Sequence, residues 1–387
     1  MKKIAFISTG FTGSIMPLVN EYLKFGYKVD LYLVVFKSQN ISEQEALQIK
    51  QTGFKYGANS IMKESVFGIS WLSNVDNFNL YVFAIPGNGK GLFMPKVSQT
   101  LQKLLRNVLA HRIKKEHYSQ IDIVGHDAFC INLTLKLKNE NVIHTLHEVF
   151  RHYQPERPIL PFVDKLLQYN IPIAVPSEYT RNYMVEQLGH SNVRCIKMGV
   201  FIGYNDFANT KVELTLPKKY LLFLGNVLPY KGLDLLYSAW KKLRSADVSL
   251  VIAGNGHSSL LDRMKEDKGI TVINRWISNA ELTYLVKHCQ GVVCPYHSAS
   301  QSGLPVTSYL FNKPILTTDV GAMKEYVANN ETGYVVPSED VGALAEKMSE
   351  LYHNPVKVTS ANIDKTVEGW NDIYKEISGY YNDLYNI

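Results

Sequence analysis

A glycine-containing turn that closes on a lysine is the clearest place in the sequence for chemistry on phosphate. The apolar run 220–224, typical of a strand, leads into Gly-Asn-Val-Leu-Pro-Tyr-Lys-Gly at 225–232, and a helical pattern follows directly. Backbone N–H groups at the opening of a helix, together with an ammonium group, are the parts that hold a diphosphate. We therefore expect Gly225, Asn226 and Lys231 to contact one. A solvated lysine beside an ordinary turn explains this segment, taken by itself, equally well.

Two more loops of this kind follow strand-like runs in the same half of the chain. In one, Arg275 and Ile277 precede Ser-Asn-Ala-Glu at 278–281, a capping box that opens a helix. In the other, small hydroxylated residues at 298–303 precede a helix, and such a run presents several N–H donors to phosphate oxygens. Because the carboxyl ends of parallel strands meet at one edge of a sheet, three such loops favour a binding site.

Two glycine-rich segments fail the test for a dinucleotide fingerprint. After Gly254-Asn255-Gly256, Ser259 stands where the third glycine is needed. At 87–91 no periodic helix opens directly from the glycines. We interpret both segments as tight turns and not as cofactor loops.

The elements that must position these loops alternate along the whole chain. Apolar runs of strand length are separated by helical patterns, which predicts an α/β fold with parallel, doubly wound sheets. The runs of the first half are 3–8, 29–35, 80–85, 121–124, 142–146 and 171–175, and those of the second half are 220–224, 249–253, 270–273, 291–294, 314–317 and 333–336. A capping box at 42–45 predicts one further helix start.

A polar segment at 205–219 separates the two series of strands. We therefore predict an N-terminal Rossmann-like domain at 1–203 and a C-terminal Rossmann-like domain at 204–365. The last segment, 366–387, carries aromatic and aliphatic residues along one helical face. It is predicted to return, as a helix, to the N-terminal domain.

Composition excludes several classes of protein. The chain has 387 residues, of which 46% are hydrophobic and 20% charged, so it can fill two cores and lacks the signature of disorder. A net charge of +6 suits anionic ligands or a membrane surface and does not by itself indicate nucleic acid, which we exclude as a partner.

The apolar run near the N-terminus stops at Ser8, too early for a signal peptide, and no run reaches the roughly 18 residues of a membrane span. We expect a cytoplasmic protein with reduced cysteines at Cys130, Cys195, Cys289 and Cys294.

Taken together, the motifs resemble those of family 4 retaining glycosyltransferases, which have the GT-B architecture of two Rossmann-like domains facing a central cleft. The resemblance covers most of the chain and is strongest from Tyr220 to Glu325. The matching segments are 222–232, 251–256, 274–282, 295–303 and 312–325, with looser matches at 145–149 and 175–180. Their order and spacing are specific, although each segment alone is a weak signal.

The resemblance implies that the domain at 1–203 is on the acceptor side and that the domain at 204–365 binds the nucleotide sugar. It also implies roles for particular residues. Lys231 would neutralise the donor diphosphate, the loop at Ile277 would meet the nucleobase, and Gln301 would contact the sugar. His147 would face the reacting centre from the first domain. The implied catalytic residues are His147, Lys231 and Gln301, and the implied donor-binding residues are Gly13, Gly225, Asn226, Arg275, Ile277, Ser302, Gly303, Leu304 and Glu325.

Two departures from the family pattern bear on donor binding. Asn226 stands where many members have an arginine. Gln301 stands near the first glutamate of the usual E-x7-E pair, and Thr307 or Tyr309 near the second. One cationic contact and both carboxylates are therefore missing, although an amide still hydrogen-bonds sugar hydroxyls. The form Ser-Ala-Ser-Gln-Ser-Gly resembles a recurring branch among bacterial surface-polysaccharide enzymes.

The sequence shows no D-x-D pair for a metal, so we expect Lys231 and helix N-termini to stabilise the leaving diphosphate without a divalent ion. No cofactor is expected beyond the nucleotide-sugar donor, with a UDP-sugar favoured over a GDP-sugar. Retention of configuration is inferred from the family. His147 is alternatively a structural histidine at a strand end, Glu325 alternatively a helix cap, and His126-Asp127 most simply a strand-end turn.

The segment 96–115 alternates basic residues with leucine and valine, as in a basic amphipathic helix. Such a helix suits a peripheral contact with the inner face of the cytoplasmic membrane and a glycan or lipid-linked glycan as acceptor. A surface helix packed on the sheet is the alternative. Two rival functions stay open: a nucleotide-sugar epimerase, which would need acid/base carboxylates in the cleft, and a non-catalytic nucleotide-binding paralogue that scaffolds a glycan-assembly complex.

Overall fold

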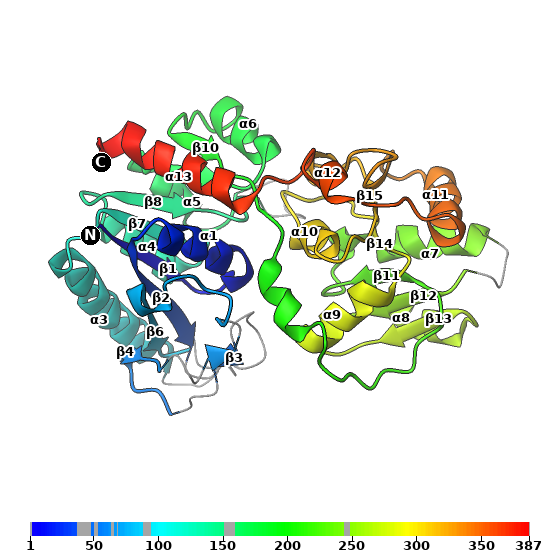
Figure 1. Ribbon diagram of the computed structural model, residues 1–387, viewed down its shortest axis with the longest axis horizontal. Coiled ribbons are helices and arrows are strands. Elements are labelled where there is room, and N and C mark those ends of the chain that lie inside the picture. Colours follow the sequence, from blue (N-terminus) through cyan, green and yellow to red (C-terminus); the bar gives the residue numbers. More distant parts are fainter. Residues whose placement is uncertain are drawn as a thin grey trace. The chain divides into compact units, whose positions relative to one another are not determined.

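The computed structural model describes residues 2–36, 48–49, 53–62, 66–67, 69–87, 94–150, 159–243 and 248–386. These residues form two compact units (Figure 1). Unit 1 runs to Lys197 and also holds the C-terminal segment from Trp370, and unit 2 runs from Met198 to Gly369. The helix start predicted at 42–45 and most of the turn at 87–91 lie outside the described residues.

Unit 1 is built on a sheet of eight strands in the order β10-β9-β8-β7-β1-β2-β6-β4. All neighbours are parallel except β4, which is antiparallel to β6 at one edge. The strands are β1 (Lys3–Ser8), β2 (Lys28–Phe36), β4 (Gly57–Ser60), β6 (Phe78–Ile85), β7 (Gln120–Val124), β8 (Val142–Thr145), β9 (Ile173–Val175) and β10 (Val193–Cys195). A separate two-stranded ladder joins β3 (Gln48–Ile49) to β5 (Val66–Phe67). The central strands are buried along almost their whole length, which explains their continuous apolar sequences.

The helices of unit 1 are α1 (Thr12–Lys24), α3 (Met94–Lys115), α4 (Ala128–Lys136), α5 (Val163–Gln168), α6 (Glu178–Glu186) and α13 (Trp370–Tyr385). The terminal helix α13 packs on α1 through Ile373, Ile377 and Tyr381. The Tyr381 hydroxyl donates to the Ile121 carbonyl at 2.5 Å, and the Tyr385 hydroxyl to the Val142 carbonyl at 2.7 Å. The return of the C-terminal helix to the N-terminal domain is therefore confirmed.

Unit 2 holds six parallel strands in the order β13-β12-β11-β14-β15-β16, which is the doubly wound Rossmann order. The strands are β11 (Leu221–Leu224), β12 (Leu250–Ala253), β13 (Ile270–Ile273), β14 (Gly291–Cys294), β15 (Ile315–Thr318) and β16 (Gly333–Val336). The helices are α7 (Leu233–Lys242), α8 (Ser259–Glu266), α9 (Asn279–His288), α10 (Gly303–Tyr309), α11 (Val341–His353) and α12 (Ser360–Ile363). Each strand lies within one residue of its predicted run.

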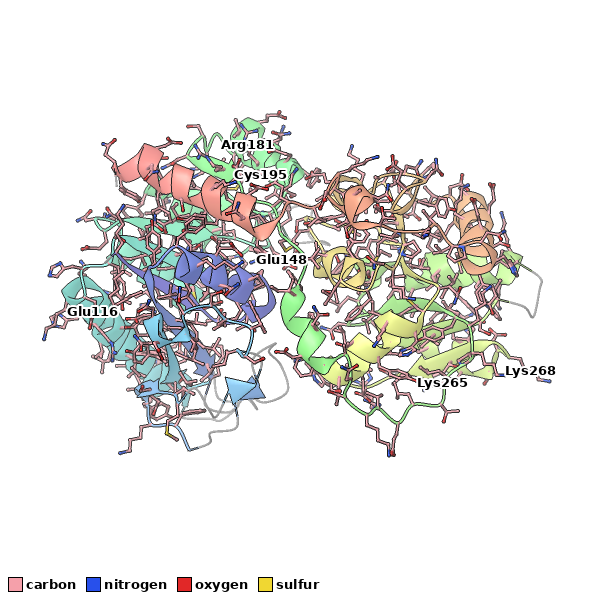
Figure 2. All side chains as sticks on the ribbon, in the orientation of Figure 1. Glu116, Glu148, Arg181, Cys195, Lys265 and Lys268 are labelled. Atoms are coloured by element: carbon pink, nitrogen blue, oxygen red, sulfur yellow. The ribbon has the colours of Figure 1, made fainter. Side chains whose placement is uncertain are left out.

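Side chains of β11 point alternately into two cores on opposite faces of this sheet. Leu221 and Phe223 belong to the core with α7, α8 and α11, whereas Leu222 and Leu224 belong to the core with α9 and α10. Each fully buried side chain of this size contributes about 1.5–3 kcal/mol. Long ionic side chains such as those of Lys265 and Lys268 lie outside both cores, around the end of α8 (Figure 2). The predicted fold class, two Rossmann-like domains, is confirmed.

Candidate functional site

The loops after β11 and β14 meet at the topological switch point of unit 2. These two strands are neighbours, and the chain leaves them in opposite directions along the sheet. Ligands of open α/β sheets bind at such a point, at the carboxyl ends of the strands. The His297 N–H donates to the Tyr230 carbonyl at 2.8 Å, and a Cβ on Gly232 would lie 1.7 Å from the Pro295 carbonyl oxygen. Only glycine permits this close approach of the two loops.

Lys231 lies in a short helix, η4 (Pro229–Lys231), directly at this contact. Its ammonium donates to the Tyr296 hydroxyl at 3.1 Å and lies 4.5 Å from the centre of the Tyr296 ring. A Cβ on Gly225 would be 3.7 Å from the same ammonium. Tyr296 is fully buried, and burial holds its pKa well above the ordinary value. The structure thus brings Lys231 and Gly225 together and adds Tyr296, which the motif Pro-Tyr-His-Ser contained but the sequence analysis did not single out.

The loop after β12 packs closely behind the loop after β11. Gly254 has a φ of +149°, and a Cβ there would lie 1.9 Å from the Gly225 carbonyl oxygen. The glycines of 254–256 therefore serve a close backbone approach, in agreement with a tight turn. Asn226 is exposed on the outside of this contact, and its carbonyl accepts the Leu228 N–H at 3.0 Å.

The loop before α10 carries an orphaned acceptor. The Oε1 atom of Gln301 is buried and has no hydrogen-bond partner among the described residues. Leaving a buried acceptor without a donor costs about 1–3 kcal/mol, so this amide is poised to accept from a bound group. Next to it, Ser302 caps α10 by accepting the Leu304 N–H at 3.3 Å, and a Cβ on Gly303 would lie 3.0 Å from the Phe201 ring.

Arg275 has a partner within its own loop. Its two terminal nitrogens contact the two carboxylate oxygens of Glu281 at 2.9 and 2.5 Å. This hydrogen-bonded pair lowers the pKa of Glu281 to about 2. Glu281 also completes the capping box with Ser278, as the sequence predicted. Arg275 therefore stabilises the start of α9. Ile277, which is half-buried, lies in the sequence between Arg275 and α9.

Glu325 lies in the short helix η5 (Met323–Tyr326) after β15, where it is half-buried. Its N–H donates to the Ala322 carbonyl at 3.0 Å, and the Ala322 N–H donates to the Ala299 carbonyl at 3.1 Å. The loop after β15 is thereby tied to the loop that carries Gln301. Glu325 thus belongs to the same group of loops as the other predicted donor-binding residues of unit 2.

Unit 1 has its own switch point, between β1 and β7, and His147 lies beside it. The His147 ring stacks on Phe11, with 4.2 Å between ring centres, and its Nε2 lies 3.5 Å from the Ser14 hydroxyl. Phe11 has a φ of +64° and precedes α1, in whose first turn Gly13 is half-buried. Burial lowers the pKa of His147 to about 4, so the ring is neutral at pH 7.

The pair His126-Asp127 is a strand-end turn, as predicted. Asp127 caps α4 by accepting the Phe129 N–H at 2.8 Å, and it also accepts the Thr9 hydroxyl at 2.6 Å. The His126 ring, however, lies edge-on to Phe11 with 6.2 Å between ring centres. Its Nδ1 is buried without a hydrogen-bond partner in the described part of the chain. His126 is therefore part of the His147 cluster, which spacing along the chain did not indicate.

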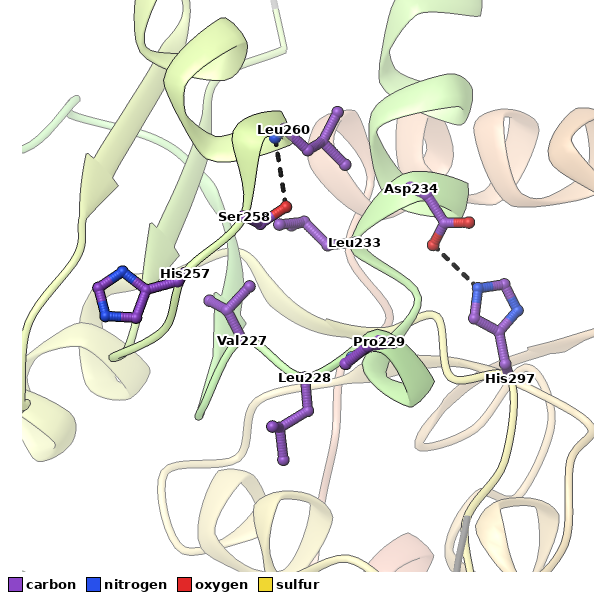
Figure 3. Close-up of a pocket in the computed structure, with 9 residues that line it drawn as sticks. All are labelled: Val227, Leu228, Pro229, Leu233, Asp234, His257, Ser258, Leu260 and His297. Carbon is purple, nitrogen blue, oxygen red and sulfur yellow. Dashed lines mark hydrogen bonds and ion pairs between the residues drawn. The ribbon is translucent and has the colours of Figure 1, made fainter. Parts of the chain in front are cut away.

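A pocket of about 390 Å³ opens between the loop after β11 and the start of α8 (Figure 3). Its apolar wall includes Val227, Leu228 and Leu260, and its polar rim includes His257 and His297. Spacing along the chain did not indicate this pocket, because its wall comes from three loops that only the fold brings together.

Known proteins resemble the whole chain in fold and unit 2 in sequence. Residues 218–354 match the family Glycosyl transferases group 1. The sucrose-phosphate synthase of Thermosynechococcus elongatus superposes over 100% of both chains with a TM-score of 0.67 at 15% identity. The fold is GT-B.

Two curated relatives match parts of this GT-B chain. The O-antigen chain mannosyltransferase C of Escherichia coli is 28% identical over 36% of the chain and 38% of its own length. The GDP-mannose:glycolipid 4-beta-D-mannosyltransferase of Xanthomonas campestris pv. campestris is 25% identical over 52% of the chain and 57% of its own length. The matched region thus spans about two fifths to three fifths of these relatives.

Proposed function

We propose that this protein is a glycosyltransferase that moves a sugar from a nucleoside-diphosphate donor to a glycan in surface-polysaccharide or glycolipid synthesis. The observation that carries the proposal is the position of Lys231, an ammonium held against Tyr296 where three close-packed loops meet at the switch point. The match of unit 2 to Glycosyl transferases group 1, and the relatives that act in O-antigen and glycolipid synthesis, support it.

Departure of a nucleoside diphosphate builds negative charge on phosphate oxygens. Lys231 and the backbone N–H groups of the surrounding loops stabilise that charge without reorganising during the reaction. In this mechanism no divalent ion is required. Transfer that persists in EDTA and is unchanged by added Mg²⁺ or Mn²⁺ is the expected result, and loss of transfer in EDTA would refute metal independence.

Gln301 contacts the transferred sugar in this proposal. Its buried Oε1 accepts a hydrogen bond from a sugar hydroxyl, which supplies the donor that this atom otherwise lacks. The amide takes over the hydrogen bonding of a carboxylate without its charge. The Kd of the free nucleotide should therefore be unchanged in Gln301→Ala, while the KM of the sugar donor rises by about fivefold.

Transfer proceeds with retention of configuration. The leaving phosphate takes the proton of the acceptor hydroxyl on the same face of the sugar, so no protein base is needed. His147, neutral because it is buried, positions the sugar by hydrogen bonding. The anomeric configuration of the first product, read by NMR before mutarotation, tests this step, and an inverted anomer would overturn it.

One experiment identifies the nucleobase of the donor. We keep a UDP-sugar as the favoured donor, whereas the Xanthomonas relative is named for GDP-mannose. Thermal unfolding in the presence of UDP, GDP and their sugars ranks them, because a bound nucleotide stabilises the folded state by mass action. A shift with GDP and none with UDP would replace the favoured base.

The acceptor is a glycan, lipid-linked at the inner face of the cytoplasmic membrane, and α3 is the proposed membrane contact. This helix has no acidic residue, and Lys96, Lys103 and Lys115 are exposed on it. Val97, Leu104 and Val108 are also exposed, at 64%, 56% and 58%. A basic rim around an apolar stripe suits an anionic lipid surface. No helix within the described ranges is long and apolar enough to cross a membrane.

Vesicle sedimentation tests the membrane contact. Binding to vesicles with anionic lipid should exceed binding to neutral vesicles and should fall when Val97, Leu104 and Val108 are all changed to serine. If the triple variant binds vesicles as wild type does, α3 is not the membrane contact. The proposed transfer reaction would not be affected by that result.

A second candidate is a non-catalytic paralogue that binds nucleotide and scaffolds a glycan-assembly complex. Asn226 and Gln301, where many family members have an arginine and a glutamate, favour it. Nucleotide binding with no turnover of any UDP- or GDP-sugar would select this candidate.

A further inference from the structure

The ring of His297 lies between two carboxylates. Its Nε2 is 2.9 Å from the Asp234 carboxylate (Figure 3), and its Nδ1 is 2.5 Å from the Glu339 carboxylate. An ionised carboxylate only accepts hydrogen bonds, whereas a neutral imidazole has a single N–H to donate. Both contacts are satisfied together only when His297 carries both protons. An imidazolium at position 297 makes both hydrogen bonds at once.

Three segments of unit 2 meet at this cation. Asp234 is in the first turn of α7, and Glu339 lies between β16 and α11. The third segment is the loop after β14, whose His297 N–H donates to the Tyr230 carbonyl. Glu339 has a φ of +63°, a left-handed conformation that costs a non-glycine residue roughly 1–2 kcal/mol. The hydrogen bond with His297 holds the Glu339 side chain in place and offsets part of this backbone cost.

The clamp formed by His297, Asp234 and Glu339 lies one residue from the phosphate-binding group. Tyr296, the neighbour of His297, receives the hydrogen bond of the Lys231 ammonium. The Pro295 carbonyl is the atom against which Gly232 packs. Any displacement of His297 therefore moves both surfaces that hold the Lys231 loop in position.

We propose that His297, as an imidazolium, is a positioning residue that fixes the loop 295–302 against the Lys231 loop and so sets the affinity for the donor diphosphate. The inference rests on the proposed function. Its chemistry is preorganisation: a cation already held in position pays no cost of ordering when the diphosphate binds.

The clamp makes donor binding depend on pH. The groups that face His297 are Asp234 from α7 and Glu339 from the segment before α11, and His257 lines the same pocket. Burial lowers the pKa of His297, but the two carboxylates outweigh it and raise the pKa above its ordinary value. A raised pKa means that the clamp is complete at low pH and is lost as the pH rises through the folded-state value.

Variants at position 297 separate charge from shape. His297→Phe keeps a planar ring without donors, and His297→Lys keeps the positive charge. In His297→Phe we expect the Kd of the nucleotide and the KM of the sugar donor to rise about tenfold, with kcat within about twofold of wild type. In wild type the Kd should rise as the pH increases above the ordinary histidine value of about 6.5, and in His297→Lys it should not change over the same interval. His353→Asn, at an exposed histidine of α11 outside the residues that line this pocket, is the matched control and should bind as wild type does.

A second variant tests the clamp in case His297→Phe does not fold. Asp234 and Glu339 are mostly exposed, at 68% and 65%, so the double variant Asp234→Asn, Glu339→Gln should fold. It should weaken nucleotide binding as His297→Phe does and shift the loss of binding to lower pH. Wild-type binding in His297→Phe, or an unchanged pH profile in His297→Lys, would overturn the inference. Failure of the wild-type protein to bind any nucleotide would instead overturn the proposed function.

Discussion

The switch points of the two units have the same topology and opposite electrostatics. In unit 1, burial shifts the pKa of two groups toward the neutral form: the pKa of His147 is lowered to about 4, and that of Asp122, in β7, is raised to about 7. In unit 2 the groups are charged: Lys231 lies against a phenol ring, His297 is paired with two carboxylates, and the pKa of Glu281 is lowered to about 2. A neutral, aromatic surface suits an uncharged glycan, and a preorganised cationic one suits a diphosphate.

The largest effect is expected where the two loops of unit 2 touch. Gly232→Ala places a Cβ 1.7 Å from the Pro295 carbonyl oxygen at a φ of +66°. We expect a loss of about 3 kcal/mol or more in the stability of unit 2, together with loss of nucleotide binding. The measurements are denaturant unfolding and calorimetric binding.

Gly189→Ala is the matched control for that change. Its φ is +65° and no atom of the described residues lies within 4 Å of the added Cβ, so it carries the backbone cost alone, about 1 kcal/mol. Equal losses in the two variants would show that the close approach of the loops is unimportant.

Removal of the Lys231 ammonium should abolish most of the electrostatic difference between the switch points of the two units. Lys231→Ala is expected to lower kcat/KM for the sugar donor by about 100-fold, or ~2.7 kcal/mol, because the charge of the leaving diphosphate loses its fixed partner. Steady-state kinetics checks this result. Lys268→Ala, an exposed lysine beyond α8, should leave kcat/KM unchanged (Figure 2), and a comparable loss there would point to a general charge effect.

Asp122 tests whether burial keeps a carboxyl of the unit 1 sheet protonated. Burial raises the pKa of Asp122 to about 7, although the hydrogen bond from Thr145 lowers it. The unfolded value is near 4, so the folded state binds the proton more tightly, and stability falls as the pH rises from about 4 through 7. Asp122→Asn should remove about 2 kcal/mol of that fall.

Urea unfolding of both proteins at pH 5 and pH 8 measures the effect. Asp364→Asn, at an exposed carboxylate, serves as the control and should keep the wild-type dependence. Parallel curves for wild type and Asp122→Asn would mean that this carboxyl is charged in the folded protein.

The smallest effect is expected at His147. His147→Ala should lower kcat for transfer by about tenfold and leave the Kd of the nucleotide unchanged, because His147 belongs to unit 1 and the loops proposed to bind the diphosphate belong to unit 2. Since its pKa is about 4, the rate should show no titration of this group between pH 6 and pH 9. An inflection near pH 6.5 that disappears in His147→Ala would show instead that the ring gains a proton during turnover.

Pattern alone predicted the strands of unit 2, because each is a continuous apolar run between turn residues. It missed β4 and β10, which are only a few residues long and contain Asn59 and Arg194, so that no apolar run marks them. The glycines of the site were predictable for a similar reason. Their φ values and close approaches exclude side chains, so the local structure requires glycine at these positions.

The sequence by itself determined which residue types stand at the carboxyl ends of the strands, and hence that a diphosphate site was plausible. Only the tertiary structure decided which of them meet. Lys231 and Tyr296 are 65 residues apart, and Asp234, His297 and Glu339 come from three segments. Strand order, not spacing along the chain, brings these groups within a few ångströms, where hydrogen bonds form and Coulomb interactions are strongest.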